Sequence, residues 1–297
     1  MLEHIFVIGG TGNIGTKAVK DLLSNGIKVT LYARNPTKAL CLFPDYDALL
    51  TIVQGDYSDL MPFYDAIKKG RYTRLLLLVQ IDSGNMNAPL LKKQLATAAY
   101  EAGVSQVVDI SSYAAGDRWR YNFAAEDHWA SEKTLMEIPN RSSLVCLRPG
   151  RLASNIVDFD IHAIKHLNMY PGSAEPDETM GWISPNDVGT VAGRMLMDDV
   201  AKHGDAVYEM IGEVLTPRKT AAVISTVVGR EIPYVHMDPI ARYTMLTDKA
   251  GLPHRIAYAL TDLNENGIQV TRALPILLGR KPETLEEYLM AYKDQLM

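Results

Sequence analysis

The stretch IFVIGGTGNIG, residues 5–15, decides the fold of this chain. Its first four residues are β-branched or aromatic, a pattern typical of a strand that is buried on both faces of a parallel sheet. Four glycines follow directly: Gly9, Gly10, Gly12 and Gly15. The apolar spacing of residues 17–23 then predicts an amphipathic helix. Strand, glycine turn and helix in this order favour a phosphate-binding unit over a tight turn without a ligand, because the backbone can approach a pyrophosphate at the helix N-terminus.

Composition and charge set the broad class of the protein. The chain has 297 residues, 47% of them hydrophobic, which is enough for one large α/β domain or for a main domain with a smaller one attached. A net charge of −5 gives no electrostatic reason to expect nucleic acid or an anionic membrane as a partner. The two cysteines are far apart, no leader pattern is visible, and no apolar run, such as residues 75–79, is longer than five residues. We therefore expect a cytoplasmic protein.

The first half of the chain alternates strands and helices. We predict further strands at residues 28–33, 50–54, 74–80, 106–110 and 143–147. We predict helices between them at residues 59–68, 90–102 and 123–137. Strands that alternate with helices indicate parallel strands joined by right-handed crossovers. The expected fold class is therefore α/β, with a doubly wound parallel Rossmann sheet.

The alternation stops after Gly150. We expect helices at residues 156–167, 188–197 and 217–228. A loop is expected at 170–179, a strand at 207–211 and an extended piece at 234–236. Ser184 or Asn186 is placed to cap the helix at 188–197, and residues 239–293 are expected to be mainly helical. The predicted nucleotide-binding domain comprises residues 1–152, with residues 181–212 packing back onto them. Residues 153–180 and 213–297 are predicted to form a smaller, mainly helical substrate-binding lobe.

The end of the second predicted strand indicates which dinucleotide binds. NAD-binding proteins usually place Asp or Glu there to hold the ribose 2′-hydroxyl, whereas this chain has Thr-Leu-Tyr-Ala at residues 30–33. Arg34 follows at once, and Lys38 comes four residues later. This spacing lets both cations converge on the 2′-phosphate of NADP, and the alternative is two solvated surface charges. NADP(H) is therefore the expected cofactor.

Further contacts to the dinucleotide are expected at the carboxyl ends of the strands, because ligands of such sheets bind there. Asp56 and Tyr57 come directly after the third strand and are placed to bracket the adenine. Gln80, at the end of the fourth strand, would face the nicotinamide-side ribose. Ser111 follows the fifth strand directly.

An ordered set of segments spans nearly the whole chain: GGTGNIG at residues 9–15, ARNP at 33–36, GD at 55–56, LRPG at 147–150, WISPNDV at 182–188 and TLEEY at 284–288. In this set the chain resembles the NmrA-like branch of the atypical short-chain dehydrogenase/reductases. The resemblance implies a Rossmann domain, NADP(H) and a small C-terminal lobe that closes over the cleft. Family members include quinone reductase-like and azoreductase-like enzymes, ergot-pathway reductases and NADP(H)-sensing regulators. The cofactor-binding residues that we predict are Gly9, Thr11, Gly12, Asn13, Ile14, Gly15, Arg34, Lys38, Asp56, Tyr57, Gln80, Ser111, Lys133 and Pro149.

The catalytic residues are less clearly marked. Ordinary short-chain dehydrogenases use a Tyr-x-x-x-Lys pair, in which Tyr transfers the proton and Lys lowers the Tyr pKa and holds the ribose. The matching spacing here joins Trp129 to Lys133, and an indole N–H cannot act as that acid. The resemblance implies that Lys133 holds the nicotinamide ribose, and the alternative is a solvated helix lysine. Tyr113, Tyr121 and His128 are candidate proton donors, with Tyr113 first, although packing explains each of them more simply.

Three functions are compatible with these patterns. The first is an NADPH-dependent reductase of a small conjugated or aromatic substrate of quinone, azo, enone or imine type, since such acceptors can take their proton from solvent. The second, suggested by Trp129, is a non-catalytic NADP(H)-sensing regulatory protein, and the third is a non-redox biosynthetic enzyme. A small-molecule substrate is the expected partner, and a homodimer is left open. No metal site is expected, because His162 and His166 share a helix face without an identifiable third ligand.

Overall fold

The computed structural model describes residues 3–46, 48–79, 87–116, 119–121, 123–261 and 267–297. The chain forms two compact units. The first unit comprises Met1–Trp119, Ala125–Arg148 and Val188–Glu209, and the second comprises Arg120–Ala124, Pro149–Asp187 and Met210–Met297. The prediction placed residues 1–152 and 181–212 together. The first unit instead ends its second segment at Arg148, resumes only at Val188, and does not include Arg120–Ala124. Substrate binding by the second unit stays a prediction.

A seven-stranded sheet forms the centre of the first unit, in the order β10-β6-β5-β4-β1-β2-β3. Its strands are β1 (His4–Ile8), β2 (Lys28–Ala33), β3 (Leu50–Gln54), β4 (Arg74–Leu77), β5 (Gln106–Ile110), β6 (Ser143–Pro149) and β10 (Val207–Met210). The five pairs from β3 to β6 are parallel, and β1 lies between β2 and β4 with Ile5 opposite Val29 and Arg74. This order reverses direction at β1 and β4, as in doubly wound nucleotide-binding sheets. The predicted fold class is confirmed.

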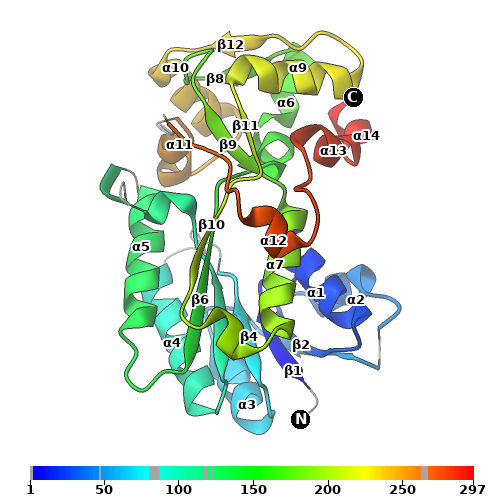
Figure 1. Ribbon diagram of the computed structural model, residues 1–297. Coiled ribbons are helices and arrows are strands. Elements are labelled where there is room, and N and C mark those ends of the chain that lie inside the picture. Colours follow the sequence, from blue (N-terminus) through cyan, green and yellow to red (C-terminus); the bar gives the residue numbers. More distant parts are fainter. Residues whose placement is uncertain (1–2, 47, 80–86, 117–118, 122, 262–266) are drawn as a thin grey trace. The chain divides into compact units, whose positions relative to one another are not determined.

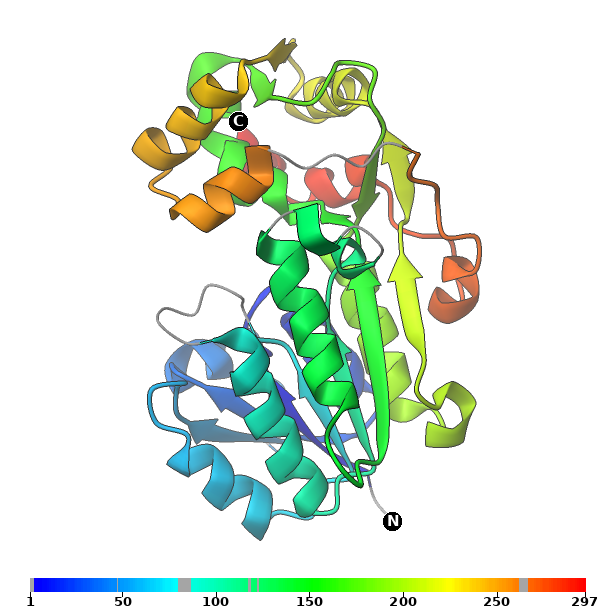
Figure 2. The same ribbon diagram turned by 90° about the vertical axis from the view of Figure 1, so that its left-hand side faces the viewer.

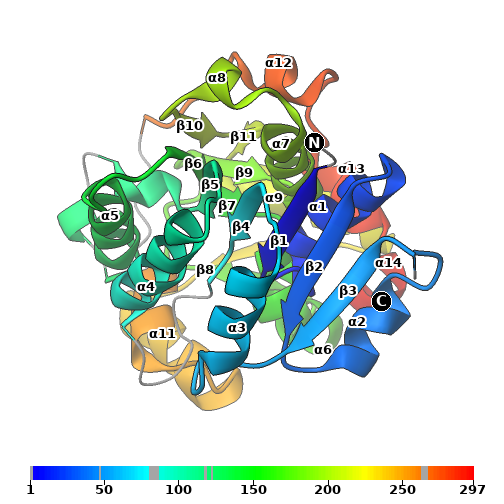
Figure 3. The same ribbon diagram turned by 90° about the horizontal axis from the view of Figure 1, so that it is seen from below.

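Helices cover both faces of this sheet (Figures 1 and 3). One face carries α3 (Met61–Lys69), α4 (Ala88–Glu101) and α5 (Phe123–Met136), drawn in cyan to green on the near side of Figure 2. The other carries α1 (Asn13–Ser24), α2 (Pro36–Leu42) and α7 (Pro185–Met197), and α8 (Val200–His203) precedes β10. The helices α1 and α7 approach closely at Gly189, where an added Cβ would lie 2.6 Å from the Ile14 carbonyl oxygen.

The core of the first unit contains a group of aromatic rings between the sheet and α3. Phe6, on the central strand β1, meets Phe63 and Tyr72 edge to face, with ring centroids 5.3 and 4.9 Å away. All three side chains are buried. Edge-to-face pairs stabilise a core beyond the area that they bury, so this group fixes the strand that leads into the glycine turn.

The second unit is built around two small sheets. The strands β7 (Arg151–Leu152), β9 (Met180–Ile183) and β11 (Glu213–Leu215) form one, and β8 (Tyr170–Gly172) pairs with β12 (Tyr234–His236) in the other. Its helices are α6 (Ile161–Leu167), α9 (Pro217–Val228), α10 (Pro239–Thr244), α11 (His254–Thr261), α12 (Leu274–Leu278), α13 (Leu285–Met290) and α14 (Lys293–Leu296). Two wide π-helical turns, Ile156–Asp160 and Met245–Lys249, adjoin α6 and α10. Trp182 and Tyr288 are the largest side chains of its core.

Several local predictions were wrong. The helix α2 was not predicted, although Asn35 caps it by accepting the Lys38 N–H and proline occupies its first position. The segment 170–179, predicted as a loop, contains β8, and the fourth strand ends at Leu77 instead of continuing to residue 80. The sixth strand runs on to Pro149 because β10 pairs beside it, where Cys146 N–H donates to the Ala206 carbonyl at 3.0 Å.

The WISPND motif joins the C-terminal segment to the rest of the second unit. The helix α7 begins at Pro185 and not at the predicted residue 188. Of the two predicted caps, Ser184 is the one observed, since its hydroxyl oxygen accepts the Asn186 N–H at 3.0 Å. The Asp187 side chain is fully buried, where it pairs with Arg280 at 2.6 Å and accepts the backbone N–H of Glu283 at 2.8 Å. Burial raises the pKa of Asp187. These bonds explain why the motif carries small polar and acidic residues at a helix start.

Candidate functional site

The glycine turn after β1 contains two glycines that the fold requires. Gly9 adopts a positive φ of 79°, and an added Cβ there would lie 2.3 Å from the Leu78 carbonyl oxygen. An added Cβ at Gly15, in the first turn of α1, would lie 2.2 Å from the Gly9 carbonyl oxygen. Both distances are far below normal contact, so a larger residue at either position would displace the backbone.

Gly12 is different, because the fold does not require a glycine there. The atom nearest to an added Cβ at Gly12 would be the Gly9 carbonyl oxygen, at 3.6 Å, which is an ordinary van der Waals distance. Gly12 is exposed and caps α1 without any side-chain hydrogen bond. The first turn of a helix leaves backbone N–H groups without intrahelical partners. The open space at Gly12 therefore adjoins N–H donors, and it fits a diphosphate. Beside it Thr11 is half-buried and Asn13 exposed, whereas Ile14 is buried.

Two exposed cations follow the end of β2. Arg34 comes directly after the strand, and Lys38 lies in the first turn of α2. Arg34 is close enough to Asp56 and Tyr57 for its positive charge to act on both side chains. The sheet thus brings Arg34 close to Asp56 and Tyr57, more than 20 residues later in the sequence. Cofactor binding by these residues stays a prediction.

Asp56 and Tyr57 shape the turn after β3. The Asp56 carboxylate accepts the N–H of Ser58 at 2.8 Å and also its hydroxyl, and these bonds lower the pKa of Asp56. Tyr57 is half-buried, and burial raises its pKa to about 12. The Tyr32 hydroxyl donates to the Asp56 carbonyl at 2.8 Å. Asp56 is therefore held in place by Ser58 of its own turn and by Tyr32 of β2.

Buried charges that were not predicted from the sequence lie beneath the carboxyl ends of β5 and β6. Lys92 on α4 and Asp109 on β5 form a fully buried ion pair at 2.7 Å, and Lys92 also donates to the Ile110 carbonyl at 2.9 Å. Burial raises the pKa of Asp109. The available signals were a lysine within an apolar helix face and an aspartate within the apolar strand QVVDI.

Ser111 belongs to a second polar group at the same edge. Its hydroxyl donates to the carboxylate of Glu132 on α5. Arg148, near the end of β6, donates to both oxygens of Glu132, from Nε at 2.9 Å and from Nη2 at 2.6 Å. This two-pronged bond ties α5 to the sheet beside Ser111. Pro149, the last residue of β6, is buried.

The predicted catalytic residues lie on the turn after β5 and on α5. Tyr113 is half-buried in the short helix Tyr113–Ala115. The His128 Nδ1 atom is buried and has no hydrogen-bond partner among the described residues. Burial and the Lys92 ammonium hold the pKa of His128 well below its ordinary value, so its imidazole is neutral at pH 7. Gln80 lies outside the described residues, and so do the surroundings of the Tyr121 side chain.

Trp129, which has the predicted spacing to Lys133, stacks on Trp119. The two indole centroids are 3.9 Å apart and their planes differ by 4°. Lys133 is exposed, and its Nζ lies 5.3 Å from the centroid of the Trp129 ring. A cation over an indole face is a favourable arrangement. The Trp-x-x-x-Lys pair therefore keeps the positive charge of the ordinary pair beside a ring that has no acidic proton.

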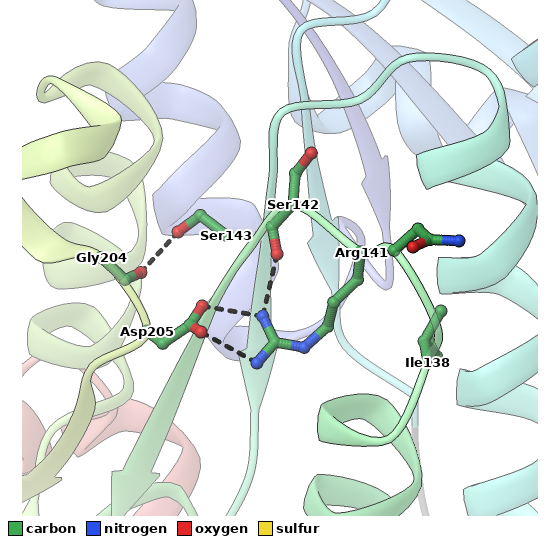
Figure 4. Close-up of a pocket in the computed structure, with 7 residues that line it drawn as sticks. Ile138, Arg141, Ser142, Ser143, Gly204 and Asp205 are labelled. Carbon is green, nitrogen blue, oxygen red and sulfur yellow. Dashed lines mark hydrogen bonds and ion pairs between the residues drawn. The ribbon is translucent and has the colours of Figure 1, made fainter.

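A hollow of about 540 Å³ lies at the amino end of β6, opposite the carboxyl ends of the strands (Figure 4). It adjoins the start of β6, and Arg141 crosses it to donate to both carboxylate oxygens of Asp205, at 2.8 and 2.9 Å. Ligands of parallel sheets bind at the carboxyl ends of the strands, so this hollow at the amino end is separate from the candidate site.

None of the helices in the described part of the chain is both long and apolar enough to cross a membrane. Within the same residues, no group of three or more His, Cys, Asp and Glu side chains is placed to hold a metal ion. His162 and His166 are adjacent on α6, with ring centroids 4.9 Å apart.

A sheet of this order, with an open glycine turn at its carboxyl edge, defines a dinucleotide-binding fold. The chain belongs to the NmrA-like family, which matches residues 1–289. The uncharacterized oxidoreductase YesF of Bacillus subtilis (strain 168) is 22% identical over 295 residues, which cover 97% of this chain and 94% of YesF.

Two solved structures have the same fold. One is the NADPH-dependent quinone oxidoreductase QOR2 of Escherichia coli complexed with NADPH, with a TM-score of 0.80 and 23% identity, covering 97% of this chain and 99% of that chain. The other is the triphenylmethane reductase of Citrobacter sp. complexed with NADP(H), with a TM-score of 0.78 and 19% identity over the same shares of the two chains. The fold is therefore that of NAD(P)-binding reductases.

Proposed function

We propose that this protein binds NADP(H) and acts as an NADPH-dependent reductase of a small conjugated or aromatic molecule of quinone, azo, enone or imine type. The observation that carries the proposal is the open space at Gly12, where the fold itself does not require a glycine. A diphosphate that occupies this space accounts for the glycine. The similarity to QOR2 and to the triphenylmethane reductase, whose structures contain NADPH or NADP(H), supports the same cofactor.

The residues fit the cofactor in the following way. The first turn of α1 would hold the diphosphate through backbone N–H groups, with Thr11 and Asn13 beside it. Arg34 and Lys38 would hold the 2′-phosphate, since both are exposed cations at the end of β2. When bound, NADPH supplies the hydride, and the protein has to align the acceptor and exclude water.

Proton transfer is the step at which this chain would differ from ordinary short-chain dehydrogenases. Trp129 has no acidic proton, and His128 is neutral at pH 7 because of its lowered pKa. Tyr113 remains the first candidate donor among the predicted residues. Quinone, azo, enone and iminium acceptors hold the added electron pair in a conjugated system and can take the proton from solvent. We therefore favour these acceptors over a simple ketone.

The test begins with cofactor binding. Calorimetric titration with NADPH, NADP⁺ and NADH is repeated on Arg34→Ala and on Arg71→Ala, an exposed arginine outside the site. We expect tight NADPH binding that weakens markedly in Arg34→Ala and is unchanged in Arg71→Ala. NADPH oxidation is then followed with a quinone, an azo dye, an enone and an imine. Binding without oxidation of NADPH by any of the four would reject the reductase and keep the cofactor.

The stacked Trp119–Trp129 pair favours a second candidate, a regulatory protein that senses NADP(H) without turnover. A closed aromatic stack in place of the catalytic tyrosine suits a protein that binds the cofactor and does no chemistry. This candidate predicts that NADPH and NADP⁺ differ in their effect on oligomeric state or partner binding, measured by analytical ultracentrifugation. Identical behaviour with both nucleotides would contradict it.

A further inference from the structure

Glu132, on α5, carries a buried carboxylate that ties this helix to two strand ends of the first unit. The Glu132 side chain is 4% exposed. Its carboxylate accepts the Ser111 hydroxyl, which directly follows β5. It also accepts Nε and Nη2 of Arg148, near the end of β6, at 2.9 and 2.6 Å. One carboxylate therefore connects a helix and two strands at the carboxyl edge of the sheet.

A second buried charge acts on the same end of β5. Lys92, on α4, donates to the carbonyl oxygen of Ile110, the residue directly before Ser111, at 2.9 Å. The ion pair of Lys92 with Asp109 is fully buried. Burial raises the pKa of Asp109 and the charge of Glu132 raises it further, so the two ion pairs lie close enough to act on each other. Ile110 and Ser111 are thus held from two helices by buried charges.

Stability alone is a weak reason for these buried charges. Moving a carboxylate out of water is costly, and an ion pair in a core offsets this cost only with excellent geometry. Replacing such a pair with apolar residues of similar volume is often neutral or stabilising. Two pairs beside one strand end therefore indicate a positional role, and the group that they position is the turn after β5.

The turn after β5 lies on the nicotinamide side of the proposed cofactor site. In the sheet, β4 alone lies between β5 and β1, on the side of β1 opposite β2. Neighbouring strands are about 4.8 Å apart, so the end of β5 lies about 10 Å from the glycine turn after β1. Arg34 and Lys38, which we assign to the 2′-phosphate, follow β2. A dinucleotide with its diphosphate at the glycine turn therefore extends its nicotinamide half toward β5.

We propose that Glu132 is a positioning residue for the nicotinamide half of the cofactor, and that it acts by fixing Ser111 and the turn that begins there. The two-pronged bond from Arg148 holds the carboxylate in one orientation, and the carboxylate in turn holds the Ser111 hydroxyl. Glu132 itself need not touch the cofactor. The inference rests on the proposed binding of NADP(H), and it does not require that the protein reduces a substrate.

The first experiment compares two ligands by calorimetric titration: NADPH and 2′-phospho-ADP-ribose, which has the same 2′-phosphate and diphosphate but no nicotinamide. We expect the wild type to bind NADPH more tightly. Glu132→Gln keeps the side-chain length and removes the charge that holds Arg148. It should weaken NADPH binding about tenfold, the effect of losing a hydrogen bond to a charged group, and leave 2′-phospho-ADP-ribose binding unchanged. Glu137→Gln, an exposed glutamate just after α5, should change neither.

Two results would overturn the inference. One is that Glu132→Gln changes the affinity for both ligands equally, or changes neither, which would leave Glu132 a structural role only. The other is that the wild type binds the two ligands equally, because nothing would then hold the nicotinamide half. If Glu132→Gln fails to fold, Ser111→Ala removes the bond to the turn and leaves the Glu132–Arg148 pair intact. It should show the same selective loss, and an equal loss for both ligands would again overturn the inference.

The second experiment determines whether Glu132 acts through Ser111. The double variant Ser111→Ala/Glu132→Gln should bind NADPH no more weakly than the weaker of the two single variants, because both changes break the same bond. Losses that add would show that Glu132 acts independently of Ser111 and would overturn this route. A protein that binds NADPH but oxidises it with no acceptor rejects the reductase, while these titrations still decide the role of Glu132.

Discussion

Replacing Gly12 with alanine tests the phosphate site without disturbing the fold. The added Cβ meets only the Gly9 carbonyl oxygen, at 3.6 Å, and the Gly12 backbone at φ −89° and ψ 176° is accessible to alanine. Alanine is a poorer helix cap than glycine, but it also reduces the entropy of the unfolded chain. These effects oppose each other, so we expect the free energy of unfolding to stay within about 1 kcal/mol of wild type.

NADPH binding by Gly12→Ala should change far more than its stability. The methyl group occupies the space that we assign to the diphosphate and moves this group away from the N–H donors of α1. A hydrogen bond to a charged acceptor contributes about 1.5–3 kcal/mol, so the loss of one weakens binding about 10- to 150-fold. Calorimetric titration with NADPH and urea unfolding of the same preparation measure the two quantities.

Gly15→Ala is the matched control, because its Cβ would lie 2.2 Å from the Gly9 carbonyl oxygen and 2.6 Å from Gly10 Cα. Backbone cannot yield as a flexible side chain does, so we expect a loss of about 1–3 kcal/mol or more in stability. Normal folding and wild-type NADPH affinity in Gly12→Ala would refute the assignment of the open space. Equal destabilisation of the two variants would refute the packing argument.

Three further predictions concern buried charges and the C-terminal segment. Lys92→Met leaves the fully buried Asp109 carboxylate without its partner and should lower the free energy of unfolding in urea by about 3–5 kcal/mol. The double variant Lys92→Met/Asp109→Leu should recover most of this loss, and no recovery would contradict the pairing. His128 has a lowered pKa in the folded protein, so the unfolded chain takes up a proton first as the pH falls below about 6.5, and stability declines. His128→Leu should therefore lose less stability than wild type between pH 7 and pH 5, by about 1–2 kcal/mol, and parallel pH profiles would rule this out. Asp187→Ala removes the carboxylate that accepts from Arg280 and from the Glu283 N–H. Trypsin should therefore cleave this variant at Arg280 faster than it cleaves the wild type or Asp177→Ala, a control at an exposed residue. Unchanged cleavage would mean that other contacts hold the C-terminal segment.

The strands were predictable because their composition is decisive by itself. The strands β2, β3 and β5 have the predicted bounds, since β-branched and apolar runs end there at a polar or glycine turn. The helix α2 was missed because seven residues are too few for a clear period, although Asn35 and Pro36 are a cap and a first-turn proline. The strand β8 was missed because Tyr-Pro-Gly has a turn composition and becomes a strand only by pairing with β12.

The polar contacts beneath the carboxyl edge could not be predicted from local sequence. Lys92 and Asp109 come from a helix and a strand whose relative register depends on the whole sheet. Ser111 was singled out as a cofactor contact, whereas Glu132 carries no motif, and Arg148, which binds it, lies in the LRPG segment without a predicted role. A charged residue inside an apolar pattern is the signal that was available, and it indicates a buried partner without identifying it.

In the site that we propose, the Trp129–Lys133 pair separates two roles that ordinary short-chain dehydrogenases combine. Their tyrosine moves a proton, and their lysine contributes a positive charge that both favours the tyrosinate and holds the ribose. In this chain the Lys133 cation persists, 5.3 Å from an indole ring that has no acidic proton. The charge can still hold a ribose and stabilise negative charge that develops nearby, but the local proton is gone. A reduction in this site is therefore easiest for an acceptor that keeps the added electron pair in its own conjugated system. For this reason the panel of quinone, azo dye, enone and imine discriminates between a reductase and a regulator, whereas an alcohol or ketone assay does not.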